Sequence, residues 1–148
     1  MDKEAIYKQL IIDEGAVYEV YLDHLGLPTF GVGHLILESD EEHGQPVGTP
    51  VSEERVRECF DRDIETAISE CSKLYGEGDF GDFPEEVQQI LVNMMFNMGR
   101  PRLSGFKNFN AALAESDWNR AADEMVDSRW YGQVGARAKR LEERMRNV

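Results

Sequence analysis

The chain has 148 residues, of which 41% are hydrophobic, and it carries a formal net charge of −13 at pH 7. This length fits one domain or two small lobes that share a core, and the hydrophobic content excludes a globally disordered chain. The acidic balance disfavours non-specific binding to nucleic acid, and no apolar run approaches the roughly 20 residues of a membrane-spanning helix.

The charge is unevenly spread along the chain. Residues 100–148 carry ten Lys and Arg against seven Asp and Glu, so the acidic excess lies in residues 1–99. Either this excess is only solubilising, or it leaves the basic last third as a local surface that faces an anion. The N-terminus shows no basic region followed by an apolar stretch, so we expect no signal peptide and folding in the cytosol.

A first helix is predicted over residues 2–14, with Asp2 as its N-cap and Gly15 directly after its end. Glu14 therefore lies at the C-terminal end of this helix. The helix macrodipole disfavours a carboxylate there and tends to raise its pKa. For this reason Glu14 is a candidate functional residue.

Two runs rich in β-branched and aromatic residues follow, over residues 17–22 and 29–37. The segment that joins them contains Gly26 and Pro28, which are typical turn residues. Together they predict a hairpin or a small antiparallel sheet. A second carboxylate, Asp23, directly follows the first run.

Glycines shape the second of these runs and the loop after it. Gly31 and Gly33 have the wrong spacing for a phosphate loop, and they indicate a close approach of the backbone to another element. Residues 38–50 are polar and contain two prolines and two glycines, so we expect a loop there.

A long helix of about 22 residues is predicted to begin after Ser52, which is a good N-cap. At 1.5 Å per residue it spans roughly 33 Å, long enough to connect two lobes. Asp63 falls on its apolar face, and a buried or half-buried carboxylate needs a partner. His34 in the sheet is the candidate partner.

The two cysteines, Cys59 and Cys71, fall on this same helix. Twelve residues of helix separate them by roughly 18 Å, which is too far for a disulfide. The absence of a nearby pair of histidines also argues against zinc. We therefore expect two structural thiols, and no metal or cofactor.

A break is expected over residues 76–83, and Pro84 then begins a helix that ends at Gly99. This helix is apolar on most sides, which is typical of a core helix, and its methionines fill space. Asn93 and Asn97 share one face of it, four residues apart. Buried amides must be hydrogen-bonded, either to the backbone or to a ligand.

The last third of the chain is expected to be helical. Three short helices are predicted, at about residues 105–115, 117–127 and 135–147. Pro101 separates the first of them from the core helix, Ser116 is the expected cap of the second, and residues 128–133 connect the last two.

Several motifs together are more specific than Glu14 and Asp23 alone, since such a pair arises easily by chance in an acidic chain. The motifs are Asp13-Glu-Gly15, Tyr21-Leu-Asp23, Thr29-Phe-Gly-Val-Gly-His-Leu35, Asn93-Met-Met-Phe-Asn-Met-Gly99, Gly105-Phe106, Ser128-Arg-Trp-Tyr-Gly-Gln133 and Arg137-Ala-Lys-Arg140. In order and spacing, over nearly the whole chain, this set resembles the T-even bacteriophage-type lysozymes of glycoside hydrolase family 24.

The resemblance implies an α+β, predominantly helical, lysozyme-like fold in a single domain, residues 1–148. Its expected parts are a sheet lobe (14–52), a connecting helix (53–75) and a helical lobe (1–13 plus 76–148), with substrate in the cleft. The loop before Ser52 is shorter than in the best-known members. We therefore expect the N-terminal lobe to lack a small helix.

The resemblance also implies a reaction. Glu14 would be the general acid that protonates the glycosidic oxygen, and Asp23 would hold the attacking water with help from the Thr29 hydroxyl. The substrate would be the β-1,4 bond between N-acetylmuramic acid and N-acetylglucosamine in peptidoglycan. A water held between Asp23 and the sugar implies inversion, and one carboxyl group must be protonated while the other is ionised.

Further residues receive roles by the same resemblance. Four match positions that contact the sugar: Leu35, Phe96, Asn97 and Phe106. Arg137 matches an arginine that pairs with the catalytic glutamate, here Glu14. The arginine would lower the pKa of this glutamate, whereas the helix end tends to raise it. The direction of the net shift therefore cannot be predicted from sequence. His34 matches a histidine that pairs with an aspartate at the position of Asp63, which favours a structural role.

The chain also departs from the family pattern. Phe109 and Glu124 stand where the pattern has a small hydroxyl and an amide, so the corresponding substrate contacts are in doubt. Typical members are basic, whereas this chain is strongly acidic. Attraction to an anionic cell wall is expected to be weak or repulsive, and salt screens it beyond about 8–10 Å.

Three functions follow as hypotheses. The favoured one is an active muramidase that acts as a monomer, without nucleic acid or stable membrane insertion. It would be a phage endolysin held in the host cytoplasm and released through holin-made lesions. The second is a lysozyme-fold cell-wall-binding or tail-associated module with little catalysis, whose mark would be loss of Glu14, Asp23 or Thr29. The third is an acidic interaction protein, such as a nucleic-acid mimic.

Overall fold

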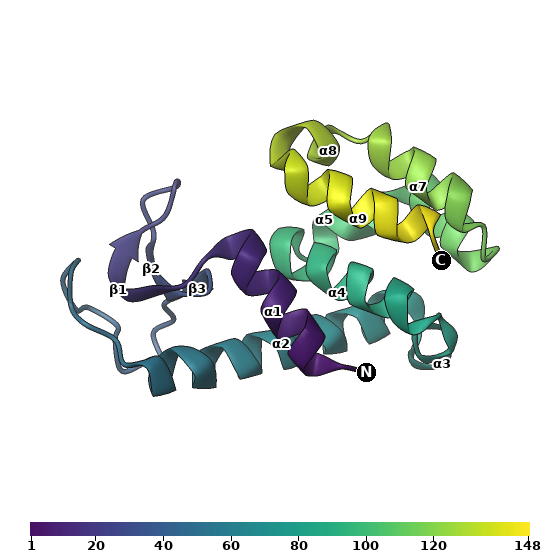
Figure 1. The fold of residues 1–148 in the computed structure, drawn as a ribbon. Helices are drawn as coiled ribbons and strands as arrows, with labels where there is room; N and C mark the ends of the chain where they lie inside the picture. Colours follow the sequence, from purple (N-terminus) through teal and green to yellow (C-terminus); the bar gives the residue numbers. More distant parts are fainter. The chain divides into compact units, whose positions relative to one another are not determined.

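The computed structural model describes residues 1–148 and contains nine helices and one three-stranded sheet (Figure 1). The predicted fold class, α+β and predominantly helical, is confirmed. The elements are α1 (Lys3–Glu14), β1 (Val17–Leu22), β2 (Pro28–Gly31), β3 (His34–Leu35), α2 (Glu53–Tyr75), α3 (Glu77–Asp82), α4 (Glu85–Met98), α5 (Arg100–Ser104), α6 (Lys107–Ala114), α7 (Trp118–Val126), α8 (Arg129–Val134) and α9 (Ala136–Arg146).

The chain divides into two compact units, called here the sheet unit (Asp2–Thr66) and the helical unit (Ala67–Val148). Helix α2 contributes residues to both. No helix combines the length and the apolar character that crossing a membrane would require.

Helix α1 begins and ends where the sequence predicts. The Asp2 side chain caps its first turn, and Gly15 follows its last turn with a φ of 74°. The Tyr7 ring lies 4.6 Å from that of Phe60 on α2, between ring centroids. This packing joins α1 to α2, and both residues belong to the sheet unit. The expected division, with residues 1–13 in the helical lobe, stays a prediction.

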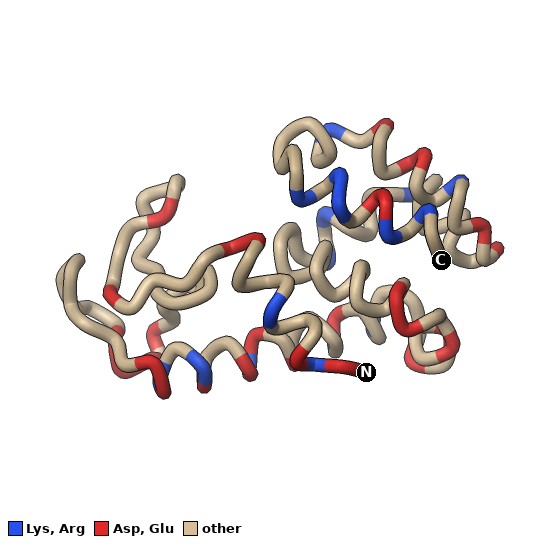
Figure 2. Tube along the Cα trace, viewed as in Figure 1, with Lys and Arg blue, Asp and Glu red and all other residues tan.

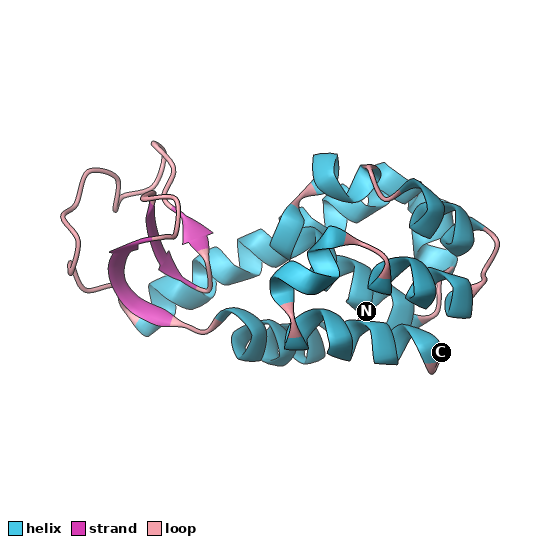
Figure 3. Cartoon of the chain, turned by 90° about the horizontal axis from the view of Figure 1, so that it is seen from above, coloured by secondary structure: helices cyan, strands magenta, loops and turns pink.

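The sheet is antiparallel with the order β1-β2-β3. Its strands are drawn in magenta in Figure 3. The predicted single run over residues 29–37 is wrong in detail, because the chain turns after Gly31 and forms two strands. Gly31 and Gly33 have φ values of 65° and 64°, which favour glycine. A Cβ at Gly31 would lie 3.0 Å from Cγ1 of Val56, so the predicted close approach is confirmed.

The loop over residues 36–52 contains no helix, as expected from its length. Its end runs along the outer edge of β1. The Val20 N–H donates to the Thr49 carbonyl at 2.9 Å, and the Val51 N–H donates to the Tyr18 carbonyl at 3.0 Å. These bonds cover a strand edge that would otherwise be open to pairing with another chain.

Helix α2 has the predicted start, since Ser52 Oγ accepts a hydrogen bond from the Arg55 N–H at 3.1 Å. Six side chains of its apolar face are buried: Val56, Cys59, Phe60, Ile64, Ala67 and Cys71. Both cysteines are free thiols. Burial raises the pKa of Cys71 to about 12, which is the behaviour of an inert structural thiol.

In the helical unit, α4 is the predicted core helix. It buries seven consecutive or near-consecutive side chains: Val87, Ile90, Leu91, Val92, Asn93, Met94 and Met95. Helix α9 packs against α4, α7 and α8, and α7 also packs against α6. The burial of α4 on most sides follows from its apolar pattern.

The break predicted over residues 76–83 is only partly correct. Gly76, with a φ of 91°, does end α2, but α3 follows directly. Phe80 is buried and holds this short helix to the helical unit. Two acidic residues in its first turn, Glu77 and Asp79, suit the positive end of the helix dipole.

The core helix α4 ends at Met98, before Pro101, as expected, and Pro101 then lies in the first turn of a further helix, α5. Two other expectations for the last third are wrong. Ser116 has a φ of 55°, and Asp117 is the side chain that caps α7. Residues 128–133 are largely helical, in α8, because Trp130 is only 1% exposed and anchors them to the core.

Candidate active site

Glu14 is the last residue of α1, and its side chain is half-buried. Its carboxylate lies at the turn between β2 and β3, since a Cβ at Gly33 would be 3.6 Å from Oε2 of Glu14. That distance is an ordinary van der Waals contact, so the φ of 64° and not the carboxylate favours glycine here. The end of the first helix thus brings Glu14 to the sheet.

Asp23 lies in the turn that joins β1 to β2. Its Oδ1 accepts hydrogen bonds from the N–H groups of Leu27 at 2.9 Å and Leu25 at 2.8 Å. These bonds, led by that of Leu27, lower the pKa of Asp23 below its ordinary value. The implied reaction needs one of the two carboxyl groups to be ionised, and these backbone donors favour the ionised form of Asp23.

Thr29 is buried, on β2, opposite Tyr21 of β1. Its hydroxyl donates a hydrogen bond to the Leu27 carbonyl at 2.9 Å. Asp23 accepts from the N–H of this same Leu27, so one backbone residue holds both predicted catalytic side chains. Their relative placement is therefore set within a few residues of chain.

Tyr21 belongs to this group, although its role was not predicted. Burial raises the pKa of Tyr21, and the charges of Glu14 and Asp23 raise it further. The phenol thus lies within the electrostatic reach of both carboxylates. Its position in the motif with Asp23 was the signal available in the sequence, and the structure places it opposite Thr29.

The structure therefore gathers Glu14, Asp23 and Thr29 around the end of α1 and strands β1 and β2. An ionised carboxylate, a hydroxyl and a second carboxyl group at a helix end are the groups that glycoside hydrolysis needs. Leu35 of β3 is paired with Thr29 in the register of the sheet and is 44% exposed. It gives this region an accessible apolar neighbour.

The predicted sugar contacts of the helical unit form a second group. Phe96 and Asn97 are half-buried at the end of α4, and Asn97 Oδ1 accepts a hydrogen bond from Trp130 Nε1 at 2.7 Å. The Phe106 ring lies 6.4 Å from the Trp130 ring. Trp130 was not predicted to matter, although the motif around it was noted. Phe109 is buried beneath Phe106, so its ring is a core group.

Arg137 of α9 is buried, which is unusual for an arginine. Its guanidinium donates to the Asn93 side-chain oxygen at 2.9 Å and to the Asn93 carbonyl at 3.3 Å. The amide predicted to need a partner therefore has one. The pairing of Arg137 with Glu14 stays a prediction. Basic side chains concentrate on α9 (Figure 2): Arg137, Lys139, Arg140, Arg144 and Arg146.

His34 has two acidic partners. The predicted pair with Asp63 is present, with 2.7 Å between His34 Nδ1 and Asp63 Oδ2. The second partner, Asp40, was not predicted, and its Oδ2 lies 2.8 Å from His34 Nε2. Burial lowers the pKa of His34, but the hydrogen bonds and charges of Asp63 and Asp40 outweigh it, and the net shift is upward.

Arg55 of α2 extends this network into the loop. Its Nε lies 2.8 Å from Glu42 Oε2, and its Nη2 lies 3.4 Å from Asp40 Oδ1. Both carboxylates are buried. The Arg55 hydrogen bond lowers the pKa of Glu42, so the pair is ionised near neutral pH. Ion pairs between Arg55 and these carboxylates thus hold the loop between β3 and α2, which contains no helix.

The sequence matches the family described as phage lysozyme over residues 12–147. It is 29% identical over 146 residues to the pre-baseplate central spike protein Gp5 of Enterobacteria phage T4, with 87% of this chain and 25% of that protein covered. It is 29% identical over 151 residues to the probable T4-type lysozyme 2 of Dictyostelium discoideum, with 87% and 86% covered. For the probable T4-type lysozyme 1 of the same organism the identity is 26% over 154 residues, with 93% and 91% covered.

The chain spans about a quarter of the spike protein's length and most of the length of the two lysozymes. The family match, in contrast, includes nearly every residue of this chain. The chain therefore belongs to the phage lysozyme family, a family of lysozyme-type glycoside hydrolases.

Proposed function

We propose that the protein is a muramidase that hydrolyses the β-1,4 bond between N-acetylmuramic acid and N-acetylglucosamine in peptidoglycan. The observation that supports this most directly is the shared attachment of Asp23 and Thr29 to Leu27. It holds an ionised carboxylate and a hydroxyl in a fixed relation, on the same small sheet that Glu14 reaches from α1. The family membership supports the same reaction class.

In the proposed mechanism, Glu14 gives its proton to the glycosidic oxygen as the sugar–oxygen bond breaks. Asp23 accepts a proton from a water that attacks the opposite face of the ring, so the configuration inverts. The Thr29 hydroxyl already donates its hydrogen to the Leu27 carbonyl. Its oxygen is therefore left to accept a hydrogen bond from that water and orient it.

The remaining residues take supporting roles in this proposal. Leu35, Phe96, Asn97 and Phe106 contact the sugar rings, the aromatic and apolar groups by packing and Asn97 through its amide. Trp130 fixes the orientation of that amide. Arg137 supports the helical unit through its hydrogen bond to Asn93.

We further propose that the protein acts as a monomeric endolysin that waits in the host cytoplasm until a holin opens the membrane. Similarity to the spike protein Gp5 favours a second candidate, a tail-associated lysozyme module. Expression in the host cytosol, with and without a co-expressed holin, distinguishes the two. Lysis that depends on the holin supports the endolysin. Lysis only on addition from outside supports the tail-associated role.

The reaction is tested by the loss of turbidity of purified peptidoglycan. Glu14→Gln should reduce the rate about 10²–10⁴-fold, the usual contribution of a general acid. Glu19→Gln, an exposed glutamate on β1, is the matched control and should clear at the wild-type rate. Equal clearing by Glu14→Gln and wild type would overturn the assignment, and no clearing by wild type at any salt concentration would favour a binding module. NMR of the first product reports whether the anomeric configuration inverts.

A further inference from the structure

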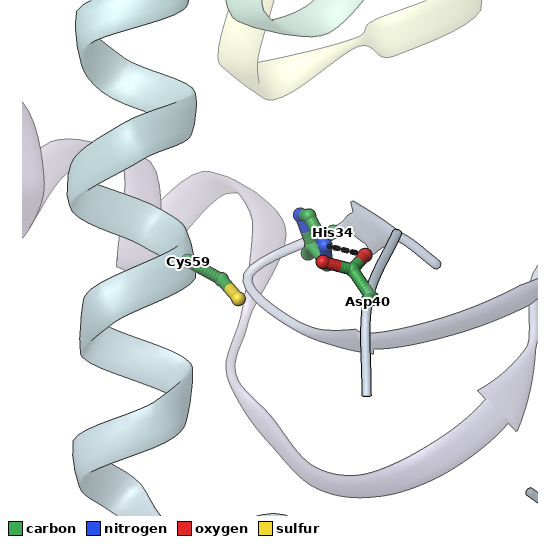
Figure 4. A group of neighbouring side chains, drawn as sticks. All are labelled: His34, Asp40 and Cys59. Atoms are coloured by element: carbon green, nitrogen blue, oxygen red, sulfur yellow. Dashed lines mark hydrogen bonds and ion pairs between the residues drawn. The ribbon is translucent and has the colours of Figure 1, made fainter. Parts of the chain in front are cut away.

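Three side chains of different chemistry meet in the interior of the sheet unit (Figure 4). His34 comes from β3, Asp40 from the loop after it, and Cys59 from α2. One ligand atom from each lies within 4.8 Å of the other two. All three residues are buried, with exposed fractions of 8%, 8% and 1%.

We propose that His34, Asp40 and Cys59 bind one zinc ion. An imidazole nitrogen, a carboxylate oxygen and a thiolate sulfur are a donor set that zinc accepts, whereas calcium and magnesium avoid sulfur. Zinc bonds of about 2.0–2.3 Å place ligand atoms of a tetrahedral site roughly 3.5 Å apart. The longer separations, at most 4.8 Å, would have to shorten by roughly 1 Å to reach that spacing.

The nitrogen available to the ion is Nε2 of His34. It lies 2.8 Å from Asp40 Oδ2, and zinc would take the place of the proton between them. The other ring nitrogen, Nδ1, is held by Asp63 at 2.7 Å. A carboxylate on the far nitrogen of a histidine is the usual support of a zinc-binding imidazole, because it fixes the ring and increases its basicity.

The charge around the three side chains also suits a dication. Arg55 lies within 4.0 Å of the carboxylates of Asp40, Glu41, Glu42 and Glu58. Arg62 lies near Cys59, with 3.4 Å between its Nη2 and Sγ. Of these carboxylates only Asp40 and Glu42 are buried, and they face the guanidinium of Arg55 and the ring of His34. A zinc ion bound at Nε2 of His34 would supply positive charge beside them in place of the histidine proton.

Such an ion would join β3, the loop and α2 at one point. The sequence argument against zinc considered only the spacing of Cys59 and Cys71 and the lack of a histidine pair nearby. The fold supplies the missing ligands from residues 19 and 25 positions earlier in the chain. The proposal concerns the stability of the sheet unit and is independent of the catalytic assignment.

The test uses the reduced full chain after treatment with a chelator and dialysis. Calorimetric titration with Zn²⁺ should give one ion per chain, and the melting temperature should rise with bound zinc. Titration with Co²⁺ should give a sulfur-to-cobalt charge-transfer band. X-ray absorption of the zinc-bound wild type should show one sulfur neighbour, at about 2.3 Å.

Cys59→Ala should abolish the cobalt band and weaken zinc binding at least ~10-fold. Cys71→Ala is the matched control, a buried thiol on the same helix, and should leave both unchanged. The proposal is overturned if the wild type shows no saturable one-to-one binding, or if its zinc has no sulfur neighbour. Since X-ray absorption uses the wild type alone, the test does not depend on the folding of any variant.

Discussion

Replacing Asp63 with asparagine removes the negative charge beside His34 and keeps the size of the side chain. The contact is 2.7 Å long, and the Asp63 side chain is 30% exposed. A hydrogen bond to a charged group contributes about 1.5–3 kcal/mol. We expect Asp63→Asn to lower the free energy of unfolding by about 2 kcal/mol, which for a chain of this size lowers the melting temperature by roughly 4–8 °C.

The loss should depend on pH. Burial lowers the pKa of His34, but Asp63 and Asp40 raise it more, so the folded value lies above the ordinary one. The ion pair then contributes its full stability below the unfolded pKa of about 6.5, and the contribution fades as the pH rises through the folded pKa. Asp63→Asn should therefore cost most near about pH 5.5 and clearly less near about pH 9.

Urea unfolding of wild type and variant at these two pH values, with a chelator present, measures the effect. Asp61→Asn is the matched control, since Asp61 is exposed, lies on the same helix and pairs only with the half-exposed Arg57. It should cost about 0.5 kcal/mol or less at both pH values. Peptidoglycan hydrolysis by Asp63→Asn should be largely retained. An equal cost at both pH values, or lost hydrolysis with unchanged stability, would refute the reasoning.

Three further outcomes are expected. Gly31→Ala should lower the free energy of unfolding in urea by about 1–3 kcal/mol, because its φ of 65° strains an alanine and the new Cβ meets Val56; an unchanged midpoint would contradict this. Asn97→Ala should cost about 1–3 kcal/mol in the same assay, because the buried indole N–H of Trp130 loses its acceptor; full stability would show that another group accepts it. Muramidase activity should rise from low to moderate salt as the repulsion between the acidic chain and an anionic wall is screened; a steady fall with salt would contradict the charge argument.

The elements with strong local signals could be predicted from sequence. Helix α1 has its cap at Asp2 and its glycine after the end, and α2 has its cap at Ser52. The pair of His34 and Asp63 could be predicted because a carboxylate on an apolar helix face must find a partner. Each of these features depends on a few neighbouring residues or on the free-energy cost of burying an unpaired charge.

The features that sequence did not predict depend on burial by distant residues. The short helices α3 and α8 form around single buried aromatic residues, Phe80 and Trp130, in segments rich in turn formers. Likewise Asp40 reads as one of several acids in a polar loop. Only the fold shows that it is buried between His34 and Arg55.

In the candidate site, the catalytic residue types could be predicted from the sequence, whereas the hydrogen bonds that hold them could not. The sequence showed only that Asp23 directly follows the first strand, whereas two backbone N–H groups of its own turn lower its pKa. Tyr21 and Trp130 stand inside noted motifs, yet their contacts with the site become visible only in three dimensions.

The turn that holds Asp23 uses backbone atoms for every bond that positions it. The side chains of Leu25 and Leu27 contribute nothing to these bonds and point largely into solvent, with exposed fractions of 70% and 42%. Selection is therefore free to exchange them without moving the carboxylate. Across members of the phage lysozyme family, these two positions should therefore vary while the aspartate stays in place.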